Sequence, residues 1–151
     1  MLQALDSMSS VVDIPEPYIP SFLAMRECRP LVNLLEAYKN SHPHRFPQVI
    51  LVDGNGRLHE RQAGLAVSVG VLANVPTVGI AKEYYPISAP SFGPAADFRS
   101  SQKSFKEKSR QLVVKRGDFL PIPDPFGTVA LGAVSLADQS RTPSLKLTKL
   151  S

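Results

Sequence analysis

The clearest hydrophobic pattern of the chain lies between residues 18 and 82. Within it, the pattern predicts a helix that begins at Pro30 and ends near Asn40–Pro43. Pro suits the first helical turn, and the apolar residues that follow are spaced along one helical face. These apolar residues are Leu31, Leu34, Leu35 and Tyr38.

A strand, a helix and a second strand are predicted next. Residues 49–52 are a short apolar run with β-branched side chains, between Pro47 and an Asp-Gly-Asn-Gly turn at 53–56, which predicts a fully buried strand. Residues 61–73 are apolar on most faces and small on some, as in a helix packed closely on a sheet, and residues 76–81 repeat the strand pattern. This order predicts a parallel βαβ unit with a right-handed crossover, and therefore an α/β fold.

The pattern is weaker on both sides of this unit. A short strand is predicted at residues 11–14, and residues 84–104 are predicted to form a long surface loop because Pro, Ser and Ala are frequent there. Two more strands are predicted at residues 112–115 and 128–136, joined through a Pro-rich turn region at 121–127. The last residues show no helix pattern, and the whole chain is predicted to form a single domain.

Length and composition narrow the classes of protein that fit this pattern. The chain has 151 residues, of which 43% are hydrophobic, enough for one domain with a core and too few for a second full domain. Its net charge of +4 permits a polyanionic partner. The single Cys28 excludes an intrachain disulfide and a multi-cysteine zinc site, and no apolar run reaches the roughly 18 residues of a membrane span. We therefore expect a soluble intracellular protein with no membrane partner.

Asp53 is the most informative candidate for chemistry, because it directly follows a predicted buried strand. In open α/β sheets, ligands and metals gather at the carboxyl ends of strands, and Gly54 lets a ligand approach closely. Glu27 supplies a second carboxylate, and Mg²⁺ is often held by one or two carboxylates plus a substrate phosphate. The local sequence leaves two other roles open: Asp53 as a turn or cap residue, and Glu27 as a surface acid paired with Arg26 or Arg29.

Two other polar residues belong to the same region. Lys82 follows the second predicted strand, so it is expected beside Asp53, where it would stabilise charge on a phosphate oxygen; otherwise it is a solvated lysine. His59 is a candidate proton carrier near neutral pH, or else a polar surface residue. The glycines at 54 and 56 match neither a dinucleotide-binding fingerprint nor a P-loop, and the turn lacks the ligand pattern of a calcium loop.

Three segments of the chain together resemble the endonuclease V family. They are residues 17–27 (PYIPSFLAMRE), 52–66 (VDGNGRLHERQAGLA) and 76–82 (PTVGIAK), and the similarity extends over roughly residues 11–136. The resemblance implies a ribonuclease H-like mixed sheet flanked by helices. It also implies Mg²⁺- or Mn²⁺-dependent hydrolysis of a phosphodiester bond in DNA or RNA that contains deaminated adenine. The cut is expected on the 3′ side, one bond beyond the inosine or deoxyinosine.

The same resemblance implies roles for individual residues. Glu27 and Asp53 match metal-binding carboxylates, Lys82 matches a lysine near the scissile phosphate, and His59 matches a histidine close to the metal. The implied wedge, which enters the nucleic acid and stacks a tyrosine ring in place of the displaced base, is Pro17, Tyr18, Ile19 and Pro20. The implied pocket for the flipped hypoxanthine is made of Ser21, Gly54, Leu65 and Gly79, with Ser21 where the family has glycine. An aromatic filler and a close-fitting pocket are what base flipping requires.

Most of the excess of positive over negative charge in the chain is local to residues 103–116, where only Glu107 opposes the Lys and Arg residues. This segment is predicted to attract phosphate groups independently of base sequence, and the attraction is weakened by salt. Its candidate phosphate-contacting residues are Lys103, Lys106, Lys108 and Arg110.

The chain also departs from the family pattern. The family's first metal-binding Asp precedes the Tyr-Ile-Pro motif on an N-terminal strand, and neither Asp6 nor Asp13 matches it in context or spacing. Residues 137–151 diverge from the family's Gly-His segment and final helix. We therefore expect a truncated or alternatively spliced homologue, or a gene-model error, without the N-terminal strands and the C-terminal helix.

These departures leave several functional interpretations open. The first is a catalytically impaired monomeric nuclease located in the cytoplasm, the nucleus or the nucleolus. The alternative is a non-catalytic form that binds inosine or nucleic acid, or regulates. A third is a chain that does not fold stably alone.

Overall fold

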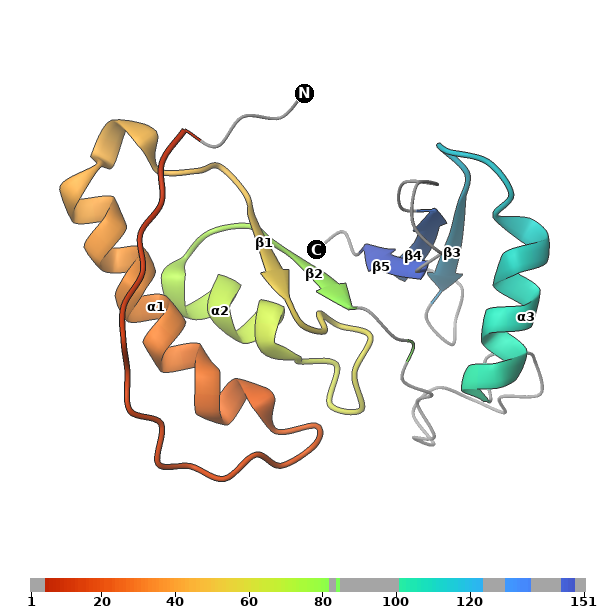
Figure 1. The fold of residues 1–151 in the computed structure, drawn as a ribbon, viewed down its shortest axis with the longest axis horizontal. Helices are drawn as coiled ribbons and strands as arrows, with labels where there is room; N and C mark the ends of the chain where they lie inside the picture. Colours follow the sequence, from red (N-terminus) through yellow and green to blue (C-terminus); the bar gives the residue numbers. More distant parts are fainter. Residues whose placement is uncertain (1–4, 82–83, 85–100, 124–129, 137–144, 149–151) are drawn as a thin grey trace.

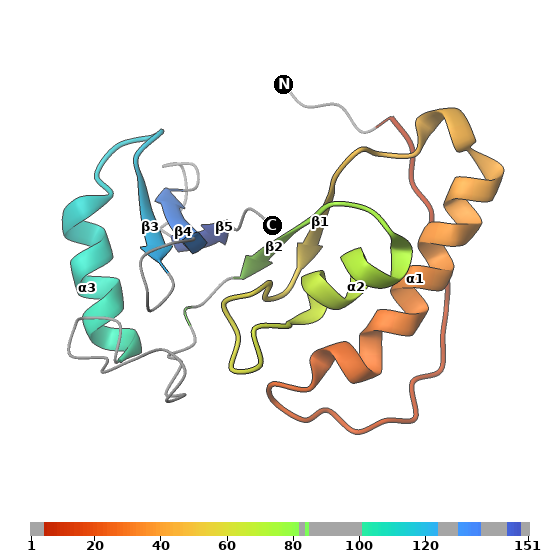
Figure 2. The same ribbon diagram turned by 180° about the vertical axis from the view of Figure 1, so that it is seen from behind.

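The computed structural model describes residues 5–81, 84, 101–123, 130–136 and 145–148. Its sheet is mixed and has the strand order β1 (Ile50–Asp53), β2 (Thr77–Ala81), β5 (Leu145–Thr148), β4 (Ala130–Leu136) and β3 (Phe119–Pro123). The helices are α1 (Leu23–Ser41), α2 (Leu65–Ala73) and α3 (Gln102–Leu112), with the short 3-10 helix η1 (Pro43–Arg45) after α1. Figures 1 and 2 show α1 and α2 together beside β1 and β2, and α3 beside β3 at the other end of the molecule. The predicted mixed α/β fold is confirmed.

The predicted βαβ unit is present. β1 and β2 pair in parallel, with Val52 opposite Gly79 and Asp53 opposite Ile80, and α2 connects them. The prediction that the first strand is fully buried is wrong, because Leu51 of β1 is 64% exposed. The reason is that α1 and α2 cover only one face of this part of the sheet (Figure 1).

Helix α1 begins earlier than predicted. It starts at Leu23, and Pro30 lies inside it instead of in its first turn. An internal proline removes a helical hydrogen bond. Burial on both sides of the proline compensates for this loss, since Cys28 is 5% and Val32 is 2% exposed. As a result, Glu27 lies on a helix and not in a segment that precedes one.

Helix α3 was not predicted. It occupies the end of the predicted loop at 84–104 and includes Leu112, where a strand over 112–115 was expected. The Ser101 side chain caps it by accepting a hydrogen bond from the Ser104 backbone N–H at 3.1 Å. Phe105, at 1% exposure, anchors it in the core.

The predicted turn region at 121–127 is wrong in its first part. Pro121 and Pro123 lie in β3, an edge strand with β4 as its neighbour. Proline donates no backbone hydrogen bond, so an edge strand tolerates it. Strand β4 confirms the strand expected at 128–136, whereas β5 was not predicted and pairs with both β2 and β4.

The predictions for the regions outside the βαβ unit are confirmed only in part. The strand expected at residues 11–14 is absent from the structure, and Val11 there is fully exposed. Much of the predicted loop at 84–104 and of the divergent tail at 137–151 lies outside the described residues. Within the described part, none of the helices is long and apolar enough to cross a membrane.

Two hydrophobic clusters hold the fold together. One lies between α1, α2 and β1 and consists of Cys28, Val32, Val52, Leu65, Ala66 and Val69. The other lies around α3, β3 and β4 and consists of Leu58, Tyr84, Phe105, Ile122, Leu131 and Val134. Leu58 comes from the connection between β1 and α2, residues 54–64, so this connection packs into the second cluster. The helix that follows it, α2, contributes Leu65, Ala66 and Val69 to the first cluster.

Candidate functional site

A cavity of about 200 Å³ lies where the segment before α1 meets the connection between β1 and α2. Its lining residues come from these two segments and from the starts of the helices that follow them: Tyr18, Pro20, Ser21, Leu23, Ala24, Asn55, His59, Gly64 and Leu65. Most of this lining is apolar, with a few polar groups, as in small-molecule and base pockets. Tyr18 is 67% exposed, so a large part of its ring remains available to a ligand.

The backbone carbonyl of Ser21 is hydrogen-bonded to side chains from the connection between β1 and α2. The Arg61 guanidinium donates a hydrogen bond to the Ser21 carbonyl oxygen, and His59 Nε2 lies 3.1 Å from the same oxygen. The Arg61 guanidinium also lies over the Phe22 ring, 4.0 Å from its centroid. These contacts join residues that are far apart in the sequence.

The protonation of His59 follows from its neighbours. Its Nδ1 accepts a hydrogen bond from the Arg61 backbone N–H at 3.2 Å, so the neutral ring carries its proton on Nε2 and donates it to Ser21. Burial and the nearby Arg61 charge lower the pKa of His59 below its ordinary value of 6.5. His59 therefore supports the wall of the cavity with both ring nitrogens occupied.

Glycines allow the connection after β1 to fold back on β2. A Cβ at Gly79 would lie 2.6 Å from the Gly54 carbonyl oxygen, and one at Gly64 would lie 2.3 Å from the Asn55 carbonyl oxygen. Gly54 itself has a positive φ of 157°, and its N–H donates to the Ile80 carbonyl at 3.0 Å. These close backbone contacts position Asn55 and Gly64, which line the cavity.

The two candidate metal-binding carboxylates come from different elements. Glu27 is half-buried on α1, and Asp53 is exposed at the carboxyl end of β1. Their chain neighbours Cys28 and Val52 belong to one hydrophobic cluster between α1, α2 and β1. Across the described residues, no group of three acidic, His or Cys side chains is arranged to hold a metal ion. Two carboxylates still fit the oxygen-rich donor set of Mg²⁺.

The structure brings together only part of the predicted site. Tyr18, Pro20, Ser21, His59 and Leu65 meet around the cavity. Pro17 and Ile19 flank Tyr18 and are exposed. Gly54 and Gly79 do not line the cavity, since Gly54 packs behind Leu65 and Gly79 packs against residues 54–56. Lys82 lies outside the described residues.

Sequence reasoning missed Asn55, Gly64 and Arg61. Asn55 and Gly64 belong to the motif at residues 52–66, and the tight Asn-Gly turn is the one local signal for Asn55. Arg61 belongs to the same motif, but nothing in the sequence indicated its contacts, because its partners Ser21 and Phe22 lie before α1.

The predicted basic residues lie on α3. Lys103, Lys108 and Arg110 are exposed, whereas Lys106 is half-buried and has an interaction partner. The buried positions of this helix are Phe105 and Ser109, so its remaining surface carries the positive charge. The helix is therefore suited to contact phosphate groups.

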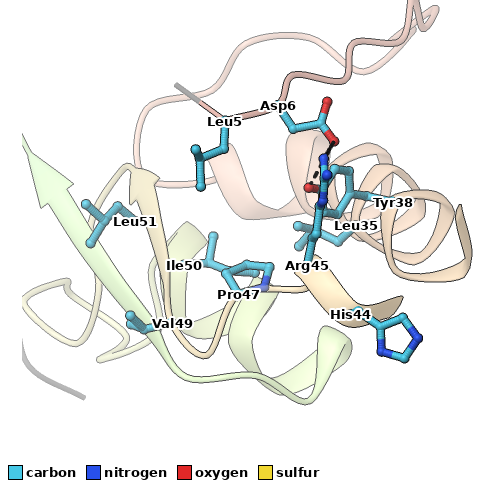
Figure 3. Close-up of a pocket in the computed structure, with 10 residues that line it drawn as sticks. All are labelled: Leu5, Asp6, Leu35, Tyr38, His44, Arg45, Pro47, Val49, Ile50 and Leu51. Carbon is cyan, nitrogen blue, oxygen red and sulfur yellow. Dashed lines mark hydrogen bonds and ion pairs between the residues drawn. The ribbon is translucent and has the colours of Figure 1, made fainter. Parts of the chain in front are cut away.

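A larger cavity of about 810 Å³ lies elsewhere, between the N-terminal segment, α1 and β1 (Figure 3). The Asp6 carboxylate accepts a hydrogen bond from the Tyr38 hydroxyl at 3.3 Å and lies 3.9 Å from an Arg45 guanidinium nitrogen. These contacts attach the N-terminal segment near the end of α1. The cavity contains none of the predicted site residues.

Comparisons of the sequence point to one family. The family model of endonuclease V matches residues 1–121. Human endonuclease V is 37% identical over 142 residues, which cover 94% of this chain and 47% of the human protein. Mouse endonuclease V is 36% identical over 135 residues, 89% of this chain and 37% of the mouse protein. The chain thus spans about half the length of these curated relatives or less.

Solved structures agree with the sequence comparisons. Endonuclease V of Ciona intestinalis, in complex with a DNA that contains an inosine followed by a ribo-adenosine, is similar with a TM-score of 0.76 and 29% identity, over 93% of this chain and 55% of that one. The catalytic domain of human endonuclease V is similar with a TM-score of 0.71 and 31% identity, over 91% and 51%. Because the family model matches well over half of the length of this chain, the chain belongs to the endonuclease V family.

Proposed function

We propose that this chain recognises inosine in nucleic acid and hydrolyses a phosphodiester bond on its 3′ side, one bond beyond the inosine. The observation that carries the proposal is the cavity bounded by Tyr18, Ser21 and His59, with an exposed aromatic ring at its side. A flipped purine needs a pocket and a group that fills the gap in the stack. The relative from Ciona intestinalis, whose structure contains an inosine-bearing DNA, supports inosine as the base.

Each part of the site has a proposed task. Residues 17–20 enter the stack, with the Tyr18 ring in place of the displaced base. Ser21, Leu65, Asn55 and Gly64 enclose the hypoxanthine. The exposed charges of α3 attract the phosphate backbone.

Glu27 and Asp53 are proposed to hold a divalent cation, Mg²⁺ or Mn²⁺. When bound, such an ion lowers the pKa of a coordinated water and neutralises charge on the leaving oxygen. Glu27 would supply a carboxylate ligand from α1 and Asp53 would supply one from the end of β1, and Lys82 is proposed to neutralise charge on the scissile phosphate. His59 holds Ser21, which directly follows the wedge residues 17–20, through the hydrogen bond between its Nε2 and the Ser21 carbonyl oxygen.

Cleavage of a labelled single-stranded oligonucleotide with one inosine tests this proposal. The unchanged chain should cut it only when Mg²⁺ or Mn²⁺ is added, and not the matched adenosine oligonucleotide. Glu27→Gln and Asp53→Asn should abolish cleavage, whereas Glu36→Gln, a charge loss elsewhere on α1, should not. Cleavage that persists in Asp53→Asn would exclude the metal assignment.

A non-catalytic inosine-binding form is the second candidate. It is favoured by the finding that no group of three acidic, His or Cys side chains within the described ranges is arranged to hold a metal ion. If the chain binds the inosine oligonucleotide selectively but does not cut it at any concentration of Mg²⁺ or Mn²⁺, this second candidate replaces the first.

A further inference from the structure

We propose that Arg61 is a positioning residue that holds the wedge segment, residues 17–22, against the cavity; this inference rests on the proposed function. Arg61 lies between β1 and α2, and its partners Ser21 and Phe22 lie before α1. Arg61 is not among the lining residues of the cavity. Its effect on a bound base would therefore act through the wedge segment.

Two different contacts make Arg61 a clamp. Its guanidinium donates to the Ser21 carbonyl oxygen and, at the same time, lies 4.0 Å from the centroid of the Phe22 ring. A planar guanidinium is suited to donate a hydrogen bond in its plane while it covers an aromatic ring with its face. The second donor to the same oxygen, His59 Nε2 at 3.1 Å, is itself oriented by the Arg61 backbone N–H.

The wedge segment needs such a clamp because its backbone is strained. Ser21 has a φ of +68°, in the left-handed region that residues with a Cβ rarely adopt. The adjacent Phe22 N–H donates to the Ile19 carbonyl at 3.0 Å, which closes a turn inside the wedge. Among the residues that the structure describes, the side chains that hydrogen-bond to the Ser21 carbonyl are those of Arg61 and His59.

The clamp sets the width of the cavity. One wall is formed by Tyr18, Pro20 and Ser21, and the other includes Asn55 and His59. Loss of the Arg61 side chain should loosen the first wall from the second. Selectivity for inosine should then fall, whereas the phosphate attraction of α3 should not change.

The first test needs no nucleic acid. We would measure hydrogen exchange of the Phe22 amide in the full chain, in Arg61→Ala, in Arg61→Lys, and in Arg57→Ala as a control that removes the same charge from the same connection. A charged hydrogen bond is lost in Arg61→Ala, so its Phe22 amide should exchange about tenfold faster. The exchange rate in Arg61→Lys should lie between the rates of Arg61→Ala and of the unchanged chain. The rate in Arg57→Ala should be about equal to that of the unchanged chain. An unchanged rate in Arg61→Ala would overturn the clamp.

The second test links the clamp to recognition. Fluorescence anisotropy in EDTA, where no cleavage interferes, would give the affinities for matched single-stranded oligonucleotides with inosine or adenosine. Arg61→Ala should lower the ratio of the two affinities about tenfold with the same salt dependence, and Arg57→Ala should keep the ratio.

The outcomes separate the two proposals. If exchange increases in Arg61→Ala but the affinity ratio stays the same, the positioning role is overturned. If the unchanged chain does not prefer inosine, the proposed function fails, and the exchange rates alone decide whether Arg61 holds the wedge.

Discussion

Gly79 of β2 faces Gly54 so closely that a methyl group on Gly79 would lie 2.6 Å from the Gly54 carbonyl oxygen. The backbone nitrogen of Gly56 would lie 2.7 Å from the same methyl group. Both neighbours are backbone atoms, so rotation of a side chain cannot relieve the clash. The turn that follows Asp53 therefore rests directly on the neighbouring strand.

Gly79→Ala should lower the free energy of unfolding by about 1–3 kcal/mol, because the turn at 54–56 must move. Urea unfolding measures this change. Gly132→Ala in β4 is the matched control, since its nearest neighbour, Leu58 Cδ2, is 3.8 Å from the added carbon. The control should be neutral or slightly stabilising. Equal effects of the two substitutions would contradict the close contact.

Stability should depend on pH through His59. The pKa of His59 is lowered in the folded chain from its ordinary value of 6.5, so the unfolded chain takes up the proton first as the pH falls. The stabilisation that the neutral His59 gives the folded chain should be fully present above pH 6.5. It should be lost as the pH falls from 6.5 towards the pKa of His59 in the folded chain, which is lower. Urea unfolding midpoints at several pH values would measure it. His59→Gln should be less stable at neutral pH but should lose less on acidification, and parallel pH profiles would rule out this role.

Tyr18→Ala should weaken binding to an inosine oligonucleotide by about 1–3 kcal/mol, the size of one base–aromatic stacking contact. Its effect on stability should be small, because the Tyr18 side chain is 67% exposed. Anisotropy titration and thermal unfolding separate the two effects. Phe119→Ala removes an aromatic ring of similar exposure, 68%, from β3 and should leave binding unchanged. Unchanged inosine affinity in Tyr18→Ala would remove the wedge assignment.

Replacement of the exposed Lys103 and Lys108 of α3 by Gln should reduce the salt dependence of binding to a single strand. The slope of log affinity against log salt should become shallower by about 0.7 for each charge that contacts phosphate. The change in slope should be the same for inosine and adenosine oligonucleotides. Lys39→Gln on α1 serves as the control, and an equal change of slope there would argue against a specific role of α3.

The parallel unit was predictable because its signals are local. The apolar run of β1, the turn at 53–56 and the second run of β2 each occupy a few consecutive residues, and their order determines the topology. The start of α1 was not predictable in this way, because Pro30 is locally a sign of a first turn. The burial of Cys28 and Val32 against α2 and β1, which only the folded chain provides, outweighs that preference.

The sequence by itself determined the family motifs, the α/β class and the two candidate carboxylates, Glu27 and Asp53, since these depend on residue types and short spacings. Only the tertiary structure decided which of the motif residues face a common cavity. Gly79 became a packing residue because of the adjacent backbone turn. His59 and Arg61 became partners of Ser21 because the chain brings together residues 38 and 40 positions apart, a separation that no local pattern encodes.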